Sequence, residues 1–423
     1  MIKDRVLFCD LHGLPRGKYI PAVTSGKESQ KVGFAQGAFS VSLDRDLLTV
    51  PGTNILEGIP DMELVLEEEE YKSWQPNTRI RLGNLYAKNA PYGLCGRGRL
   101  EETIKELAKL DLAPMIGIEL EAYAFEKDDD GTWRPYNTPG ALVYGTGPSN
   151  DPKGLLDQIF STAYECNLPV ESLNGEYDNG QFELTLCFDN AMKACDNTFL
   201  FKLMAREVAF KNDLLLTFLP KPIPERGGSG FHVNMSLRNS SGKNIISEDG
   251  KLSDISKYFM AGLMKHHESL SSFLAPTVNS YERLAPASMA GYWANWAEDH
   301  RLVTLRTSTK SEKSARLEHR TGDCSCNPYL AVTALLQAGI LGIENKFSLQ
   351  DPEDLDGLEN VRATRHVPSN LLNALDALEK DAELCGKVGD LISKAHIFLK
   401  RDEAKRLEGK NLDEIRDYYL PFI

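Results

Sequence analysis

The chain has little that would place it in a membrane or in a disulfide-stapled fold. Its 423 residues contain no apolar run as long as a membrane span, and the opening stretch MIKDRVLFCDLHG lacks the long apolar core of a signal peptide. Only eight cysteines are present. The one close pair, Cys324 and Cys326, has no second pair nearby to complete a zinc site. We therefore expect reduced thiols and a cytoplasmic protein with no membrane partner.

Positive charge is also scarce. The chain has 48 Lys and Arg against 61 Asp and Glu, which gives a formal net charge of -13. Binding to nucleic-acid phosphates requires clustered Lys and Arg, so we expect no nucleic-acid partner. A local group of arginines could still bind ATP. Internal repeats and low-complexity segments are absent too, which excludes solenoid and disordered architectures.

The remaining composition is that of a folded chain with more than one domain. Apolar residues make up 42% and charged residues 26%, as in soluble globular proteins, and the length exceeds one ordinary domain. Residues 1–92 have short apolar runs separated by turn residues and predict a small β-rich unit. Its acidic run from Glu67 to Glu70 is best interpreted as a solvated strand end. From about residue 100, strands and helices alternate to about residue 345, and a helical tail follows Pro368.

Two glutamates share one face of a predicted strand in the segment MIGIELEAYAF. Alternation puts Glu119 and Glu121 on the face opposite Ile118 and Leu120. Strand geometry separates the two carboxylates by roughly 6–7 Å, too close to be left in a pocket without a cation. An edge strand with a solvated glutamate face is the alternative.

The segment GEYDNGQFELTL repeats this pattern. Gln181 and Glu183 share one strand face, and the turn formed by residues 178–180 can fold Glu176 back towards Glu183. An ordinary amphipathic hairpin would explain the same residues.

A glycine-rich segment precedes the third polar stripe. His232, Asn234 and Ser236 share one face of the strand in GGSGFHVNMSL, and Gly228 and Gly230 let the backbone pass close to a ligand. A lone histidine in a strand is usually a hydrogen-bonded structural residue. One beside a polar stripe is a better candidate ligand.

The fourth stripe combines charges of both signs. Arg316, Glu318 and Arg320 share one face in SARLEHRTGD, and Arg301 and Arg306 lie just upstream. A surface ion-pair ladder is one interpretation. If the stripe is buried beside other carboxylates, its arginines would need anionic partners such as phosphate or a substrate carboxylate.

Jointly the four stripes indicate a metal-dependent phosphoryl-transfer site. Hard divalent ions prefer oxygen ligands with an occasional imidazole, and arginines beside such ions neutralise the charge that develops on a transferring phosphate. The candidate ligands of Mg²⁺ or Mn²⁺ are Glu119, Glu121, Glu176, Glu183, His232 and Glu318.

Six motifs in a fixed order resemble the glutamine synthetase superfamily from about residue 100 to residue 423. They are G-x-E-x-E, E-x-x-x-G-Q-x-E, G-S-G-x-H-x-x-x-S, N-S-Y-x-R-L, R-x-E-x-R and N-P-Y-L-A. The resemblance implies an α+β fold. A small N-terminal β-grasp domain of residues 1–92 would precede a large catalytic α/β domain of residues 93–423, with a curved antiparallel sheet and C-terminal helices.

The resemblance also implies the activity. Members attack the γ-phosphate of ATP with the γ-carboxylate of glutamate and displace the resulting γ-glutamyl phosphate with an amine. The cofactor would be Mg²⁺ or Mn²⁺, with ATP as co-substrate, in a nitrogen-metabolism ligase. The assembly would be a homo-oligomer of stacked rings, a dodecamer in the family, with sites shared between neighbouring subunits. Asp44 or Asp61 is a candidate for the residue that completes a neighbour's site.

Individual roles carry over from the resemblance in two sets. One metal would be held by Glu121, Glu176 and Glu183, and would position glutamate. The other would be held by Glu119, His232 and Glu318, and would bridge the ATP phosphates.

The substrate contacts carry over in the same way. Gly228 would lie in the loop that contacts glutamate, and Arg283 and Arg320 would pair with its main carboxylate. Arg301 and Arg306 would be catalytic residues at the transferring phosphate. The nucleotide side would comprise Ser236, Arg316 and Asn234.

Two departures from the motif pattern concern the amine. Members that use ammonia carry a glutamate six residues after the arginine of N-S-Y-x-R-L, where this chain has Met289. The histidine two residues before the first glutamate of E-x-x-x-G-Q-x-E is Asn174. We therefore expect an organic primary amine as acceptor, with the aromatics of GYWANW either lining its pocket or packing the flap. Glu282 and Glu298 are the acids that could replace the missing charge.

Three alternatives remain open from the sequence. The chain could be an authentic glutamine synthetase that uses ammonia by another deprotonation route. It could be a catalytically silent structural or regulatory homologue, although all six candidate metal ligands are present. A guanidino-kinase-like phosphotransferase shares the Glu and Arg chemistry but lacks the ordered motifs.

Overall fold

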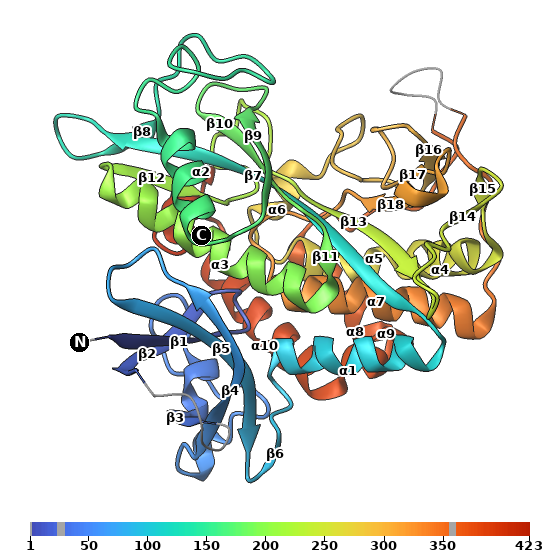
Figure 1. The fold of residues 1–423 in the computed structure, drawn as a ribbon, viewed down its shortest axis with the longest axis horizontal. Helices are drawn as coiled ribbons and strands as arrows, with labels where there is room; N and C mark the ends of the chain where they lie inside the picture. The colour runs from blue at the N-terminus through green and yellow to red at the C-terminus, as the bar shows by residue number, and fades with distance from the viewer. Residues whose placement is uncertain (1, 23–29, 355–360) are drawn as a thin grey trace.

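The described residues form two large β-sheets, and the strands of each sheet come from a separate part of the chain (Figure 1). The computed structural model describes residues 2–22, 30–354 and 361–423. The smaller, six-stranded sheet lies between Lys3 and Pro91, and the larger, ten-stranded sheet lies between Ala113 and His319. Helices cover the large sheet and form the C-terminal part. The α+β class predicted from the sequence is therefore confirmed.

The N-terminal sheet has the order β2-β1-β5-β4-β3, with β6 paired to β5. β1 and β5 run parallel, and the other neighbours are antiparallel. Alternation buries Val6, Leu64 and Ile80 on the core face. The run from Glu67 to Glu70 is exposed as expected, at an irregularity in the pairing of β4 with β5. The strands are β1 (Lys3–Cys9), β2 (Pro15–Pro21), β3 (Lys31–Ala35), β4 (Asp61–Lys72), β5 (Thr78–Ala87) and β6 (Ala90–Pro91).

The large sheet is built around one long central strand, β7. Its order is β16-β17-β18-β13-β7-β10-β9, and β8, β11 and β12 pair with the ends of β7. In Figure 1, β7 and β13 cross the molecule side by side, with β17 and β18 beyond β13. The strands are β7 (Ala113–Lys127), β8 (Trp133–Pro135), β9 (Val170–Gly175), β10 (Gln181–Leu186), β11 (Asp189–Asn190), β12 (Leu214–Thr217), β13 (Phe231–Arg238), β16 (Trp296–Glu298), β17 (Leu305–Ser308) and β18 (Arg316–His319), with β14 (Ser247–Glu248) and β15 (Lys251–Leu252) as a separate pair.

Helix α7 is the centre of the helical layer. Its residues from Pro328 to Gly342 are buried, as expected for a helix covered on all sides. Gly262 of α4 packs so closely against it that an added Cβ would lie 2.0 Å from the carbonyl oxygen of Ala338. In the described ranges, no helix is long and apolar enough to cross a bilayer. The helices are α1 (Gly96–Lys109), α2 (Leu155–Glu165), α3 (Ala191–Lys211), α4 (Asp254–Lys265), α5 (His267–Leu274), α6 (Ser280–Arg283), α7 (Pro328–Asn345), α8 (Leu371–Lys380), α9 (Ala382–Val388), α10 (Asp390–Arg406) and α11 (Leu412–Tyr419).

A buried carboxylate ties the two parts of the molecule together. Asp196 of α3 accepts hydrogen bonds from Arg97 Nε at 2.9 Å and Arg97 Nη2 at 3.0 Å. It also accepts from the hydroxyls of Tyr71 on β4 and Tyr329 on α7, at 3.0 and 2.7 Å. All its hydrogen-bonding capacity is used by groups from three other elements, α1, β4 and α7. The domain boundary expected between residues 92 and 93 falls between β6 and α1, and stays a prediction.

Candidate active site

Polar side chains from four adjacent strands form one row across the large sheet. In the antiparallel register, Glu121 on β7 lies opposite Glu183 on β10, and Glu119 lies opposite His232 on β13. β18 pairs with β13 and continues the row with Glu318. Because alternate residues of a strand point to the same face, the short alternating runs of the sequence bring these side chains together. Glu176, just after β9, joins them from the turn.

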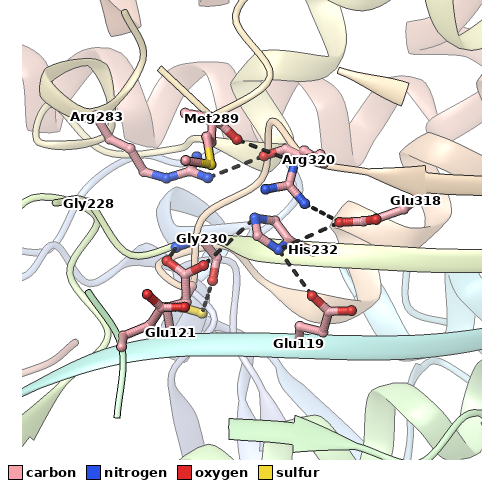
Figure 2. Close-up of polar contacts among 12 residues, drawn as sticks. Glu119, Glu121, Gly228, Gly230, His232, Arg283, Met289, Glu318 and Arg320 are labelled. Atoms are coloured by element: carbon pink, nitrogen blue, oxygen red, sulfur yellow. Dashed lines mark hydrogen bonds and ion pairs between the residues drawn. The ribbon is translucent and has the colours of Figure 1, made fainter. Parts of the chain in front are cut away.

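The first group consists of Glu119, His232 and Glu318, each of which offers one atom within 4.8 Å of the others. His232 Nδ1 lies 3.2 Å from Glu119 Oε2 and 4.0 Å from Glu318 Oε1 (Figure 2). Asn234 Nδ2 donates to Glu119 Oε1 at 2.9 Å. Burial alone would raise the pKa of Glu119, but the hydrogen bonds from His232 and Asn234 outweigh it and lower that pKa to about 2. Glu119 is therefore held as an anion.

The second group consists of Glu121, Glu176 and Glu183, which meet within the same 4.8 Å limit. Burial raises the pKa of Glu183 to about 7, and the neighbouring carboxylates of Glu119, Glu121 and Glu176 add to the effect. The opposing effect of His232 is smaller. Burial and Glu121 likewise raise the pKa of Glu176. The positive charges of the protein around this group therefore do not balance the negative charges of its carboxylates.

The chemistry of both groups fits divalent cations. Three partly buried carboxylates and a mixed carboxylate–imidazole set are oxygen-rich donor sets of the kind Mg²⁺ and Mn²⁺ prefer. His232 lies between the groups, with Nε2 3.9 Å from Glu121 Oε1. The amide of Gly230 donates to Glu121 Oε2 at 2.7 Å, which fixes the rotamer of that carboxylate. The two groups could hold two neighbouring ions.

Two arginines lie on the side of His232 away from Glu119 and Glu121 (Figure 2). Arg283 is buried and donates to the main-chain oxygens of Thr321 at 2.9 Å and Arg320 at 3.2 Å. Arg320 contacts Glu318 through Nη1 and donates from Nε to the carbonyl of Met289 at 3.3 Å. Burial lowers the pKa of Arg283, since carbonyl partners do not neutralise its charge. Both guanidinium groups are rigidly placed cations.

Gly228 is required by this packing. A Cβ at this position would lie 2.6 Å from Arg283 Cγ and 2.9 Å from the carbonyl oxygen of Pro220. The main chain of the glycine-rich segment therefore rests directly on the aliphatic part of Arg283. Gln181 Nε2 also donates to the carbonyl of Gly228 at 3.0 Å, which links the segment to β10.

Most of these side chains surround one cavity of about 770 Å³. Arg306 lies in its wall with Nη1 3.0 Å from Glu318 Oε2, and Arg301 is an exposed lining residue. Arg316 lines both this cavity and an adjoining one of about 330 Å³ that contains Asn234 and Ser236. The structure brings together every site residue expected from the sequence, distributed over these two cavities. In the larger one are Glu119, Glu121, Glu176, Glu183, His232, Glu318, Gly228, Arg283, Arg320, Arg301, Arg306 and Arg316.

The loop after α6 places a methionine at the rim. Met289 lines the cavity and is 60% exposed, so its thioether is available to a ligand. Within the part of the chain that the structure describes, the aromatic residues that follow Met289 do not line the cavity. Tyr292 stacks on His366 at 4.9 Å and 7°, and Trp293 meets the same ring edge-on at 5.6 Å. Trp296 donates to the carbonyl of Gln350 at 2.8 Å. These rings pack the flap against the protein, which was the second of the two interpretations above.

Other apolar residues in the lining were missed by sequence reasoning. Val143 and Tyr144 come from the long connection after β8, and Tyr177 comes from the turn before β10. All three are large, exposed side chains, at 46%, 70% and 79%. Irregular segments carry no periodicity that would assign a side chain to a face. The cluster of turn residues around them was the only signal.

Comparison with known proteins agrees with this geometry. Residues 93–419 match the family model described as the catalytic domain of glutamine synthetase. The chain is 31% identical over 422 residues to a glutamine synthetase of Pyrococcus abyssi, covering 96% of this chain and 92% of that one. It is 29% identical over 419 residues to the γ-glutamylputrescine synthetase PuuA of Escherichia coli, covering 95% and 88%. A solved structure of apo GmaS superposes with a TM-score of 0.85 at 26% identity, covering 99% and 96%.

Proposed function

The chain belongs to the glutamine synthetase family of ligases, and on this premise we propose that it joins an organic primary amine to the γ-carboxylate of L-glutamate, using ATP through a γ-glutamyl phosphate. The choice of an organic amine depends on one observation: Met289 lies at the rim of the cavity. The acidic side chains of the cavity belong instead to the two candidate metal groups. The metal ions, glutamate and ATP would bind in the two cavities of the candidate active site.

The metal-holding residues would act in two sets. Glu121, Glu176 and Glu183 would hold the ion next to glutamate, and the set with Glu119 and His232 would hold the ion next to the ATP phosphates. Bound Mg²⁺ or Mn²⁺ supplies charge neutralisation at the phosphates and at the attacking carboxylate. The carboxylate repulsion among Glu121, Glu176 and Glu183 supports this assignment, because a divalent cation would relieve it.

The remaining residues of the site position and neutralise charge. Arg283 and Arg320 would bind the main carboxylate of glutamate, with Gly228 shaping the space beside them. Arg301 and Arg306 would stabilise the transferring phosphoryl group. Asn234, Ser236 and Arg316 would contact the nucleotide in the adjoining cavity. Such a site needs no protein nucleophile, since the substrate carboxylate attacks the phosphate directly.

The rim of the cavity favours an amine with an apolar body. Ammonia is mostly ammonium at neutral pH, so its use requires an anion to attract it and a base to accept its proton. Met289 can do neither, and Asn174 is a buried amide that donates to the carbonyl of Gly175. Among the described residues, neither Glu282 nor Glu298 lines the cavity, and Glu298 accepts hydrogen bonds from Thr307 and Thr309.

The apolar lining residues Val143, Tyr144 and Tyr177 support the same choice. Burying a hydrocarbon or aromatic amine against them would add binding energy that ammonia cannot gain. The name of one relative, a γ-glutamylputrescine synthetase, supports the choice of an organic amine.

Two other functions are distinguished by specific observations. An ammonia-using glutamine synthetase is supported by the names of the Pyrococcus relatives, and opposed by Met289. A silent homologue is opposed by the two intact candidate metal groups.

Steady-state kinetics with glutamate, ATP and Mg²⁺ decides among the three. We expect kcat/KM for an alkyl or aryl amine to exceed that for ammonia, measured by amine-dependent phosphate release and by identification of the amide product. A clear preference for ammonia would establish the first alternative, and no product with any amine would establish the second.

We further infer that residues 1–92 form an N-terminal domain which completes the catalytic domain, residues 93–423, of a neighbouring subunit in a ring-shaped homo-oligomer. Asp61 starts β4 and is exposed. Asp44 contacts Arg406 within the chain at 3.2 Å, so Asp61 is the freer of the two acids to reach another subunit. Light scattering combined with activity measurements tests this inference: an active monomer would contradict it.

A further inference from the structure

A second cavity, of about 590 Å³, lies where the N-terminal sheet, α3 and the last residues of the chain meet. It shares no lining residue with the two cavities of the candidate active site. Its walls are largely apolar and include rings from α3, from β8 and from the residue that follows β12. These are Trp133, Phe199, Phe210 and Phe218, with Phe422 from the last residues.

Three cations from α3, Lys202, Arg206 and Lys211, line this apolar space. In the described part of the chain, the hydrogen bonds of Lys202 and Arg206 go to main-chain carbonyls. Lys202 Nζ donates to Cys324, and Arg206 donates to Phe422 through Nη1 and to Pro421 through Nη2 at 3.2 Å. Among the described residues, Arg206 Nε is buried without a hydrogen-bond partner. The carbonyl oxygens accept from the other groups, but no acidic side chain there pairs with either positive charge.

The acidic side chain in the lining does not supply the missing negative charge. Glu207 is bound at 2.7 Å to Arg5, and it also accepts hydrogen bonds from Trp74 at 2.6 Å and Gln75 at 3.2 Å. Burial lowers the pKa of Arg206 to about 10, as happens when a cation is taken out of water without an anionic partner. An unpaired charge of this kind is costly to keep in a fold.

We propose that this cavity binds a small amphipathic carboxylate, with its anionic group between Arg206 and Lys202 and its hydrocarbon or aromatic body against Phe210 and Phe218. A carboxylate would form charge-assisted hydrogen bonds with both cations. The body would be removed from water by the aromatic wall, in a space of the size that small ligands occupy. This site is separate from the one that binds glutamate and the amine, and does not depend on the identity of the amine.

Calorimetric titration of the full chain tests the site, with octanoate and phenylacetate as probes and octylamine as the cationic analogue. We expect saturable binding of at least one carboxylate, with one site per chain, and no comparable binding of octylamine. Arg206→Gln should weaken the binding at least tenfold. Phe210→Asp should do the same by placing a negative charge at the rim.

Phe210→Asp and Phe160→Asp separate a loss of binding from a loss of folding. Arg206 also holds the last residues of the chain, whereas Phe210 is 74% exposed, so Phe210→Asp leaves the core intact. Phe160→Asp, at a 47% exposed ring on α2 outside the cavity, should bind the probe as the unmodified chain does. The proposal is overturned if neither carboxylate binds saturably, if octylamine binds equally well, if Phe210→Asp leaves binding unchanged, or if ATP with glutamate displaces the probe.

Discussion

Glu121 and Glu183 face each other across two adjacent antiparallel strands. Like charges placed directly opposite in a sheet destabilise it, and here the repulsion helps to raise the pKa of Glu183 to about 7, after burial. A fold that keeps such a pair gains something other than stability from it. In this chain, the gain we propose is a divalent cation held next to glutamate.

Glu183→Gln should therefore separate stability from activity. Turnover should fall by roughly three orders of magnitude, as expected when transition-state charge stabilisation is lost. With chelator present, the free energy of unfolding should rise by up to about 1 kcal/mol because one like charge is gone. Phosphate-release kinetics and urea unfolding measure the two effects. Glu165→Gln, at an exposed acid on α2, is the matched control, and near-normal turnover of Glu183→Gln at saturating Mg²⁺ would refute the metal assignment.

Met289→Glu should increase the use of ammonia. The new carboxylate would lie at the rim of the cavity, where it could attract ammonium and accept its proton, and kcat/KM for ammonia should rise about tenfold or more. Since Met289 is 60% exposed, the fold should tolerate the change. Met289→Gln has the same length without the charge and should leave ammonia use low. Equal effects of the two variants would show that charge at this position does not set the amine preference.

Asp196→Asn should destabilise the contact between the two parts of the molecule. The change removes the buried carboxylate from the partly buried Arg97 guanidinium, which keeps only its pair with the exposed Glu67 at 3.0 Å. We expect a cost of about 2 to 3 kcal/mol. Tyr71→Phe removes one hydrogen bond of the same cluster and should cost about 1 kcal/mol. Urea unfolding measures both. Asp413→Asn, which breaks an exposed pair with Arg416 at 2.8 Å, should cost no more than about 1 kcal/mol, and an equal cost for Asp196→Asn would contradict the prediction.

His396 should make the protein sensitive to mild acid. Burial lowers its pKa to about 3, and the nearby charge of Lys400 acts in the same direction. The unfolded chain takes up this proton near pH 6.5, whereas the folded protein does not until about pH 3. The stability from neutral His396 is thus present above pH 6.5 and is lost as pH falls towards 3, by up to about 1.4 kcal/mol per pH unit. Burial lowers the pKa of His267 to about 4 and adds to the trend.

Urea midpoints measured between pH 7 and pH 5 check the acid sensitivity. His396→Gln should show a shallower decline than the unmodified chain because one titrating group is removed. Parallel declines would mean that His396 contributes nothing to the acid sensitivity.

The site-forming strands could be predicted because their geometry is local. A period of two residues assigns each side chain to a face whatever the strand pairs with, so the alternation in the segments that became β7 and β13 was enough to group Glu119 with Glu121 and His232 with Asn234. Which strands are neighbours is a long-range property. For that, the order of the motifs and their resemblance to a known family were needed.

Two features of the structure had no such signal. Tyr144 and Tyr177 line the cavity from irregular segments, where the direction of a side chain depends on tertiary contacts. Asp196 lies in the second turn of a long helix and contacts partners 99 to 133 residues away in the sequence. Helical periodicity can indicate that such a residue is buried, but not which groups from other elements satisfy its charge.

The close fit between Gly228 and Arg283 has a consequence for genetics. Any side chain at residue 228 must displace Cγ of Arg283 or the carbonyl of Pro220. A mutation at this position is therefore expected to act by moving the Arg283 side chain. Gly228→Ala and Arg283→Lys should then form an epistatic pair: the double variant should be little worse than the more severe single variant, because both lesions disable the same cation. In a mutational screen, Gly228 would score as intolerant to change for a steric reason, although the atoms added at that position need never touch a substrate.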